Sequence, residues 1–259
     1  MRYLVTLLIL SHIPAVYSEL EAGIGLSAVH FPHYIGSDQT HTLALPFPYI
    51  RYRSEKLNID RNLIQTKMWS HGNWNLEMSF GGAVAVMSDD NDAREGMEDL
   101  DFIGEAGPAL HYYFSGDRQS ENAILLSLPL RAAVSTDFSQ AEGRGFSFNP
   151  TLYWRRGYQF RTILVRPQIT AGIRSASSQL YDYTYGVDAE FATPEREEYH
   201  ADGGYGGYSL SYSTSLRFDD YLLATGLSYH NINGASYDDS PLVRQKENFL
   251  IGIAWAMIF

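Results

Sequence analysis

The sequence predicts an all-β protein, a transmembrane antiparallel β-barrel of about twelve strands with short periplasmic turns and longer external loops. Three observations predict this fold class. Segments of roughly ten to fifteen residues alternate between apolar and polar positions, their connections alternate between short and long, and the chain ends on an apolar segment that stops at Phe259. In residues 248–259, large apolar side chains occupy one strand face and mostly small ones the other, which is typical of the last strand of a bacterial outer-membrane barrel.

The N-terminal residues 1–18 are expected to be a secretory signal peptide, which leaves 19–259 as one barrel domain. The positive residue Arg2 precedes a short apolar core that is interrupted by Pro14. Small or medium-sized side chains occupy the cleavage positions, and we expect cleavage after Ser18. Beyond this segment, no run approaches the roughly 20 apolar residues that a membrane-spanning helix needs. We therefore expect the bilayer to be crossed by a closed barrel, in which every backbone polar group is paired.

The predicted strands follow one another with one face apolar and the other polar or small. The clearest segments are 20–28, 74–86, 124–135, 163–173, 208–217 and 248–259, and the segments 42–53, 101–114, 145–156 and 221–232 follow the same rule less cleanly. Both chain ends of such a barrel lie on the periplasmic side, which requires an even number of strands. Residues 54–72 are therefore expected to add a hairpin, in which Lys56–Asp60 and Asn62–Ser70 meet near Arg61.

The connections predict which end of the barrel faces the periplasm. Short links are expected at 115–121, 156–159 and 219–220, and longer external ones at 88–100, 136–144, 175–202 and 233–247. Aromatic residues crowd the short links, as expected of rings at the boundary between lipid and water. The predicted periplasmic girdle consists of Tyr112, Tyr113, Phe114, Tyr153, Trp154, Tyr158, Phe160, Phe218 and Tyr221.

The formal net charge of -11 argues against a nucleic-acid partner, because phosphate binding needs a basic surface. The acid is concentrated in residues 89–101 and 182–202, where the only basic residues apart from histidine are Arg94 and Arg196. The first acidic stretch does not match the helix–loop–helix calcium template, because Ala93 or Arg94 would occupy its fifth position. A solvated loop is favoured over a looser divalent-cation contact that would seat the loops among lipopolysaccharide head groups.

Charged residues on the predicted inner face are the most informative interior feature. Two interpretations apply: a lumen that selects or binds a polar solute, or a network of paired charges that fills a narrow barrel. The second is favoured because burying these charges unpaired would be costly. The residues expected to face the lumen are Arg131, Arg155, Arg161, Arg166, Arg217, Glu77 and Glu105, with Asp101 nearby.

An enzymatic function is not expected, and no cofactor, metal or catalytic residue is predicted. A hydrolase would need a serine, a histidine and an orienting acid that converge at the rim. His111 and His230 are expected at opposite ends of the barrel, and no G-x-S-x-G turn is present. The tyrosines in and after the longest loop either form an external contact surface or pack over the barrel mouth; they are Tyr183, Tyr185, Tyr199, Tyr205 and Tyr208.

Several strings of residues, spread in order over the chain, resemble the MipA/OmpV family of outer-membrane proteins. They include Pro32 to Asp38, Leu45 to Pro48, Gly96 to Asp101, Tyr183 to Val187 and Asp239 to Arg244. A tight loop that needs Gly36 is the preferred interpretation of the first string.

The resemblance implies an outer-membrane location, with outer-membrane lipid and lipopolysaccharide as surroundings and no catalytic residues. It also implies a scaffold that brings a murein-degrading transglycosylase together with a murein-synthesising penicillin-binding protein. A porin-like channel for small solutes and a surface adhesin are the alternatives that the family offers.

Overall fold

The computed structural model describes residues 19–53, 57–60 and 63–259. Its strands form one antiparallel sheet, and within the described residues the sheet contains fourteen strand segments. They are β1 (Glu19–Pro32), β2 (Thr40–Arg53), β3 (Leu57–Asp60), β4 (Leu63–His71), β5 (Trp74–Ala83), β6 (Phe102–Ser115), β7 (Ala123–Thr136), β8 (Ala141–Phe148), β9 (Thr151–Arg155), β10 (Tyr158–Phe160), β11 (Ile163–Ala176), β12 (Gly204–Phe218), β13 (Tyr221–Asn231) and β14 (Glu247–Ile258). One α-helix, α1 (Ser178–Tyr185), and two short 3-10 segments, η1 (Ser88–Asp90) and η2 (Ala189–Phe191), lie in loops.

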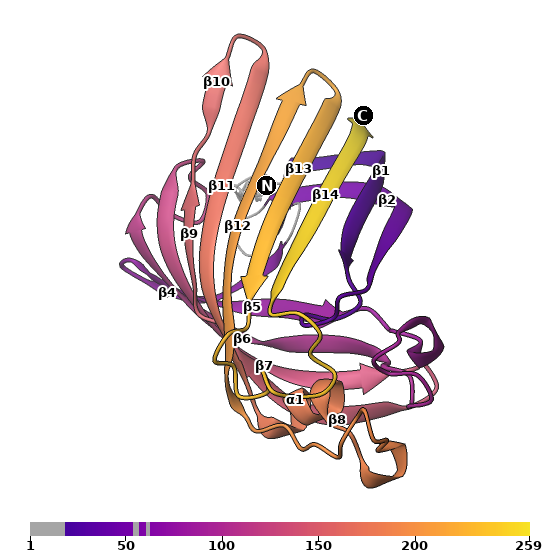
Figure 1. Ribbon diagram of the computed structural model, residues 1–259. Helices are drawn as coiled ribbons and strands as arrows, with labels where there is room; N and C mark the ends of the chain where they lie inside the picture. The colour runs from indigo at the N-terminus through magenta and orange to yellow at the C-terminus, as the bar shows by residue number, and fades with distance from the viewer. Residues whose placement is uncertain (1–18, 54–56, 61–62) are drawn as a thin grey trace, which may run out of the picture.

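The sheet closes on itself through an interrupted strand. Both β8 and β9 pair with β7, while β9 and β10 pair with β11. These three segments therefore occupy one position in the ring, and the barrel has about twelve positions, as predicted. The first interruption contains Pro150, which has no backbone N–H to donate to a neighbouring strand. Figure 1 shows the curved sheet that results.

The two ends of the barrel carry different connections. One end, here called the turn end, has the turns 72–73, 116–122, 161–162 and 219–220 and the C-terminus. The other, the loop end, has the connections 33–39, 84–101, 137–140, 177–203 and 232–246. In Figure 1 the C-terminus lies at the turn end, and α1 lies among the loops at the opposite end. This asymmetry is the predicted one.

The predicted extra hairpin is present as β3 and β4, which pair from Leu57↔Thr66 to Asp60↔Leu63. Its expected meeting point at Arg61 lies outside the described residues. The predicted turn at 156–159 is wrong. Tyr158–Phe160 pair with Ile163–Val165, so the turn falls at 161–162. A break beside Gly157 had resembled a turn, but the strand resumes after it.

The outer face of the barrel is apolar and the inner face is polar. Ile251 and Trp255 are 55% and 41% exposed on the outside, whereas Ser127, Ser147 and Ser215 are buried on the inside. A continuous exposed apolar surface of this kind belongs in lipid, because soluble monomers rarely expose large apolar patches. The structure thus confirms the predicted barrel, in which the large apolar side chains lie on the outer face.

No helix among the described residues is long and apolar enough to cross a membrane.

The aromatic girdle follows the same alternation. Phe114, Tyr158 and Phe160 are exposed on the outer face of the turn end. Tyr113 and Tyr153 instead point inward and pack with buried Ala123 and Leu125. Neighbouring residues of a strand must face opposite ways, so a run of adjacent aromatics cannot all belong to the girdle.

The main apolar core lies at the loop end, where the loops fold together over the barrel mouth. We call this unit the loop cap and define it as residues 33–39, 84–101, 177–203 and 232–246. Its buried side chains form one cluster with Ala133 and Ala176, which lie at the loop ends of β7 and β11. The cluster members from the loops are Tyr34, Val86, Ala93, Leu100, Leu180, Tyr181, Tyr185, Val187, Ala201, Ile232, Ala235, Tyr237 and Leu242.

Candidate functional site

The centre of the loop cap is a stack of tyrosines whose hydroxyls join separate loops. The rings of Tyr185 and Tyr237 are stacked at 3.8 Å with an interplanar angle of 9°. The Tyr185 hydroxyl donates to the Ile35 carbonyl at 2.7 Å, and the Tyr34 hydroxyl donates to the Leu242 carbonyl at 2.8 Å. Burial raises the pKa of Tyr34 to about 12 and that of Tyr185 well above its usual value. Both phenols are therefore neutral donors at physiological pH.

Some tyrosines in and after the longest loop pack over the barrel mouth, and others are exposed at the surface. Tyr185 packs inside the cap, and the Tyr183 hydroxyl accepts from the Asp101 amide at 2.8 Å. Tyr199 donates to Asp239 at 2.6 Å, whereas Tyr205 and Tyr208 are exposed at the start of β12. Most of this tyrosine group therefore builds the cap rather than a free contact surface.

The loop after β1 turns sharply at Gly36, whose φ of 110° favours glycine. Asn248 holds the turn, because its side chain accepts from the Gly36 amide at 2.7 Å and donates to the Ser37 carbonyl at 2.9 Å. Ser37 is fully buried and accepts a hydrogen bond from Asn91 at 3.0 Å. The predicted tight loop is confirmed, and it fastens the first loop to the last strand.

The two arginines of the acidic loops bind backbone carbonyls. Arg94, 3% exposed, donates to the carbonyls of Thr184 at 3.1 Å and Glu98 at 3.0 Å. Arg196, 8% exposed, donates to the carbonyls of Ala93 at 3.1 Å and Glu95 at 3.0 Å. Each guanidinium therefore ties the two acidic loops together. Most of the carboxylates of these loops lie at the surface, and no cluster of three or more metal-ligating side chains among the described residues could hold a metal ion.

In the middle of the barrel, Arg131 on β7 is bound by side chains from the two strands that precede it. It donates to Ser79 on β5 at 2.9 and 2.8 Å and lies 3.5 Å from Glu105 on β6. Glu105 also accepts from Ser147 on β8 at 2.8 Å. The structure thus brings two of the residues expected in the lumen into one hydrogen-bonded group.

Further charges gather on the inner wall at the turn end. Glu77, which is fully buried, lies 3.3 Å from Arg118 and 3.7 Å from His111. Arg155 donates to the Asp117 carbonyl at 2.7 Å. Arg161 is placed apart from all of these, exposed in the turn 161–162, so its expected position in the lumen is wrong. The strand runs past the expected turn, and this displaces Arg161 to the tip of the hairpin.

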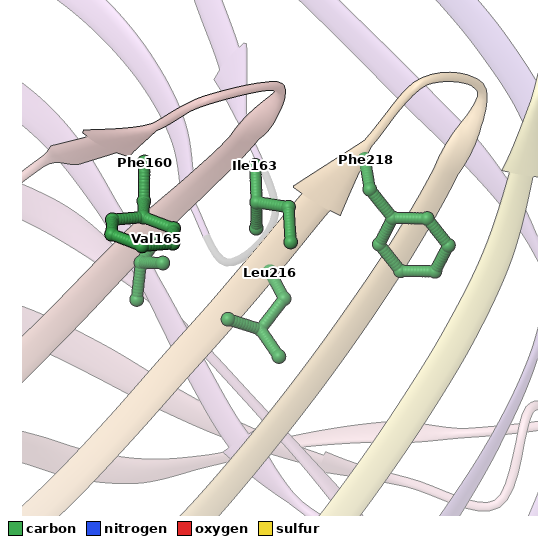
Figure 2. A pocket seen from close by; sticks show the side chains of 5 residues that line it. All are labelled: Phe160, Ile163, Val165, Leu216 and Phe218. Carbon is green, nitrogen blue, oxygen red and sulfur yellow. The ribbon is translucent and has the colours of Figure 1, made fainter.

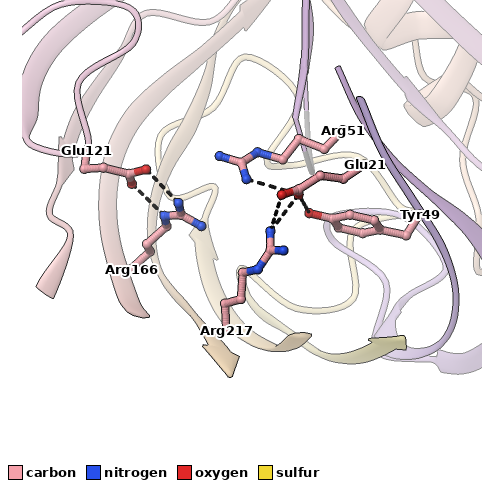
Figure 3. Close-up of polar contacts among 6 residues, drawn as sticks. All are labelled: Glu21, Tyr49, Arg51, Glu121, Arg166 and Arg217. Carbon is pink, nitrogen blue, oxygen red and sulfur yellow. Dashed lines mark hydrogen bonds and ion pairs between the residues drawn. The ribbon is translucent and has the colours of Figure 1, made fainter. Parts of the chain in front are cut away.

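Two carboxylates at the turn end hold three arginines (Figure 3). Glu21 accepts two hydrogen bonds from Arg217, at 2.7 and 2.6 Å, and one from Arg51, at 3.1 Å. Glu121 and Arg166 form a two-pronged pair at 2.6 Å for both bonds. In Figure 3 the guanidinium groups of Arg166 and Arg217 lie between the two carboxylates.

Sequence reasoning missed four of these partners, namely Glu21, Arg51, Arg118 and Glu121. Glu21 and Arg51 lie directly opposite one another on β1 and β2. The alternation of each segment places both residues on the inner face, so the sequence could have identified them. Arg118 and Glu121 lie in the turn 116–122, where alternation gives no direction.

His111 and His230 lie at opposite ends of the barrel, as expected. His230 contacts Ser228 at 2.9 Å, and Ser228 contacts Ser211 at 2.7 Å. This chain leads to a second hydroxyl, whereas a catalytic serine triad needs a carboxylate or amide that orients the histidine. The arrangement gives no support to hydrolytic chemistry.

A groove of about 440 Å³ on the outer face at the turn end is lined only by apolar side chains (Figure 2). The lining residues are Phe160, Ile163, Val165, Leu216 and Phe218. They come from β10, β11 and β12 and belong to the lipid-facing surface. The groove carries no polar group that could orient a substrate.

Comparison with known proteins relates the chain to bacterial outer-membrane proteins. A family model described as "MltA-interacting protein MipA" matches residues 24–259. Outer membrane protein Omp26La of Vibrio anguillarum and outer membrane protein OmpV of Vibrio cholerae are each 33% identical to the chain over 89 residues. Each match covers 34% of the chain and 34% of the relative, so the aligned part spans about a third of the length of these relatives.

Proposed function

The chain belongs to the MipA family of outer-membrane proteins, and on that premise we propose that it is a non-enzymatic scaffold for enzymes of murein synthesis and degradation. The loop end faces the outside and the turn end faces the periplasm, where such enzymes work. The family description names an MltA-interacting protein, and we extend this to a murein transglycosylase that binds at the periplasmic rim beside a penicillin-binding protein.

The observation that carries the proposal is the loop cap in the external mouth. The cap core includes Ala133 and Ala176 of the barrel wall, so the loops pack into the mouth rather than stand around it. A filled mouth opposes diffusion of solutes through the barrel. The surfaces that remain for function are then the two rims, and only the turn end is accessible to periplasmic proteins.

The turn 116–122 is a docking element at that rim that is held by its own hydrogen bonds. Asp117 accepts hydrogen bonds from the Gln119 amide at 2.9 Å and from the Ser120 amide and hydroxyl at 2.8 and 2.7 Å. These bonds, led by the one from the Ser120 hydroxyl, lower the pKa of Asp117 and keep it ionised. Arg155 and Asn122 connect the turn to the barrel wall. A pre-ordered turn loses little conformational entropy when a partner binds.

The test is retention of murein enzymes from an envelope extract on a column of the folded barrel. We expect Asp117→Ala to reduce retention of the transglycosylase and the penicillin-binding protein by about tenfold, because the turn loses its internal bonds. Asp137→Ala is the matched control. Asp137 caps the loop 137–140 in the same manner, with bonds to the Ser139 and Gln140 amides at 2.8 Å each, but at the external end.

Each outcome separates the proposal from its alternatives. Retention that is lost with Asp137→Ala and kept with Asp117→Ala would contradict the proposal and favour a surface adhesin. Stepwise conductance in a planar bilayer that changes with Arg131→Ala would favour the channel. Absence of any retained murein enzyme would reject the scaffold itself.

A further inference from the structure

Three arginines form a diagonal row on the inner wall at the turn end. Arg155 of β9 lies opposite Gln168 of β11, and Arg217 of β12 lies opposite Leu164 of β11. Arg166 stands between Gln168 and Leu164 on the same face of β11, because alternate residues of a strand share a face. Diagonal neighbours of this kind have Cβ atoms about 7–8 Å apart or slightly less. Three positive charges are therefore lined up along adjacent strands.

Two carboxylates contact the row among the described residues. Glu121 pairs with Arg166 and Glu21 pairs with Arg217, whereas Arg155 donates to the backbone carbonyls of Asp117 and Arg118. The carboxylate of Asp117, nearby, is engaged within its own turn.

Two donors in the row lack an acceptor. The Nε of Arg155 and the Nη1 of Arg166 are buried, with no hydrogen-bond partner among the described residues. In Figure 3 the guanidinium of Arg166 uses one edge for Glu121, and its remaining nitrogen points away from that carboxylate. Leaving a buried charged donor unpaired is costly, and such groups call for a partner.

The wall beside the row increases this cost. Leu222, Ala256 and Ile258 lie on the strands between Arg217 and Glu21, and they form a buried apolar cluster with Tyr49 of β2. A charge next to a low-dielectric wall is poorly screened and attracts counter-ions more strongly than one in open water.

From this geometry we propose that Arg155, Arg166 and Arg217 bind a small periplasmic compound that carries two or more carboxylate or phosphate groups. A ligand with two anionic groups can contact two neighbouring guanidiniums of the row at the same time. The ligand enters from the periplasm because the loop cap fills the opposite mouth. The site shares Arg155, and through Glu121 the turn 116–122, with the rim proposed for murein enzymes, but anion binding does not depend on that function.

The experiment is calorimetric titration of the folded barrel in detergent with sodium pyrophosphate, and separately with citrate, at constant ionic strength. We expect both to bind, and Arg166→Gln or Arg217→Gln to weaken binding by at least about tenfold, since hydrogen bonds between charged groups are the strong ones. The matched control is Arg156→Gln, which removes the same charge from an exposed position one residue from Arg155. We expect the control to alter affinity by less than about twofold, because exposed charges contribute little.

A gain-of-binding variant guards against variants that fail to fold. Glu121→Gln removes the carboxylate that occupies Arg166, so pyrophosphate should bind more tightly than to the unaltered barrel. The change in gel mobility on heating reports whether each variant is folded. The proposal is overturned if the unaltered barrel binds neither anion, if Arg156→Gln weakens binding as much as Arg166→Gln, or if Glu121→Gln leaves the affinity unchanged.

Discussion

The two ends of this barrel use buried arginine in opposite ways. In the loop cap, Arg94 and Arg196 donate to backbone carbonyls of neighbouring loops. At the turn end, Arg51 and Arg217 both contact the carboxylate of Glu21, and Arg166 has a buried donor without an acceptor among the described residues. The first set is satisfied by backbone groups of the fold, whereas the second set contacts ionised side chains.

This difference teaches how one residue type takes on two roles in one chain. A backbone carbonyl neither titrates nor leaves its place, so the cap arginines fix the loops permanently. The arginines at the turn end contact carboxylates, and a carboxylate or phosphate group of a ligand offers them the same kind of charge-assisted hydrogen bond. We infer that the loop end is built for closure and the turn end for exchange with the periplasm.

The largest effect should follow removal of the central ring of the cap. Tyr237 is fully buried and stacks on Tyr185, so Tyr237→Ala should lower the free energy of cap opening by about 4 kcal/mol. Hydrogen exchange of the cap amides, read by mass spectrometry, measures that opening. The barrel amides should keep their protection.

Two variants calibrate this result. Tyr237→Phe keeps the stack and loses only the hydrogen bond to the Gly206 carbonyl, at 3.1 Å, so it should cost about 1 kcal/mol. Tyr113→Ala, at the turn end, should leave cap exchange unchanged. Equal deprotection of the cap by Tyr113→Ala would show that the two ends are one cooperative unit.

Arg94→Met should be next in size. It retains the apolar stem but leaves the carbonyls of Thr184 and Glu98 without their donor, at a cost of about 3 kcal/mol. Exchange should accelerate in residues 84–101 and 177–203 together, because Arg94 joins these two loops. Acceleration confined to one loop would contradict the proposal that Arg94 joins the two loops.

The cap should also open at alkaline pH. Burial raises the pKa of Tyr34 to about 12, so the closed cap holds a proton that the opened cap releases near pH 10. The stabilisation is therefore fully present below about pH 10 and lost as the pH rises toward 12, by about 1.4 kcal/mol per pH unit for this one tyrosine. Cap exchange, corrected for the intrinsic pH dependence of amide exchange, measures the slope. Tyr34→Phe should make it shallower.

The fold was predictable from the sequence because strand alternation is a local property. The faces of residues 124–135 and 248–259 follow from a period of two, which needs no knowledge of the partner strand. The extra hairpin at β3 and β4 followed from the requirement for an even number of strands. The turn was misplaced to 156–159 because an internal break and a true turn have the same local composition.

The candidate site was harder to predict because its pairs depend on ring closure. Glu21 and Arg217 are separated by 196 positions along the chain, and they meet only because β1 and β12 lie close in the closed barrel. The loop cap left even less signal, since Ile232, Tyr237 and Leu242 are buried in irregular backbone without any period. Of these three residues, only Leu242 lies in a string, Asp239 to Arg244, that the family resemblance marked in advance.

The smallest effect should come from the turn end, and it decides whether the comparison holds. Arg166→Gln removes a charge whose partner Glu121 has a side chain 37% exposed, so water can solvate the carboxylate that remains. The substitution also relieves repulsion from Arg155 and Arg217. We therefore expect the free energy of barrel unfolding, from guanidinium midpoints, to change by less than about 0.5 kcal/mol. A loss of unfolding free energy near the 3 kcal/mol expected for Arg94→Met would mean that arginines hold the fold together at both ends. An arginine that is available to a ligand should contribute much less to stability.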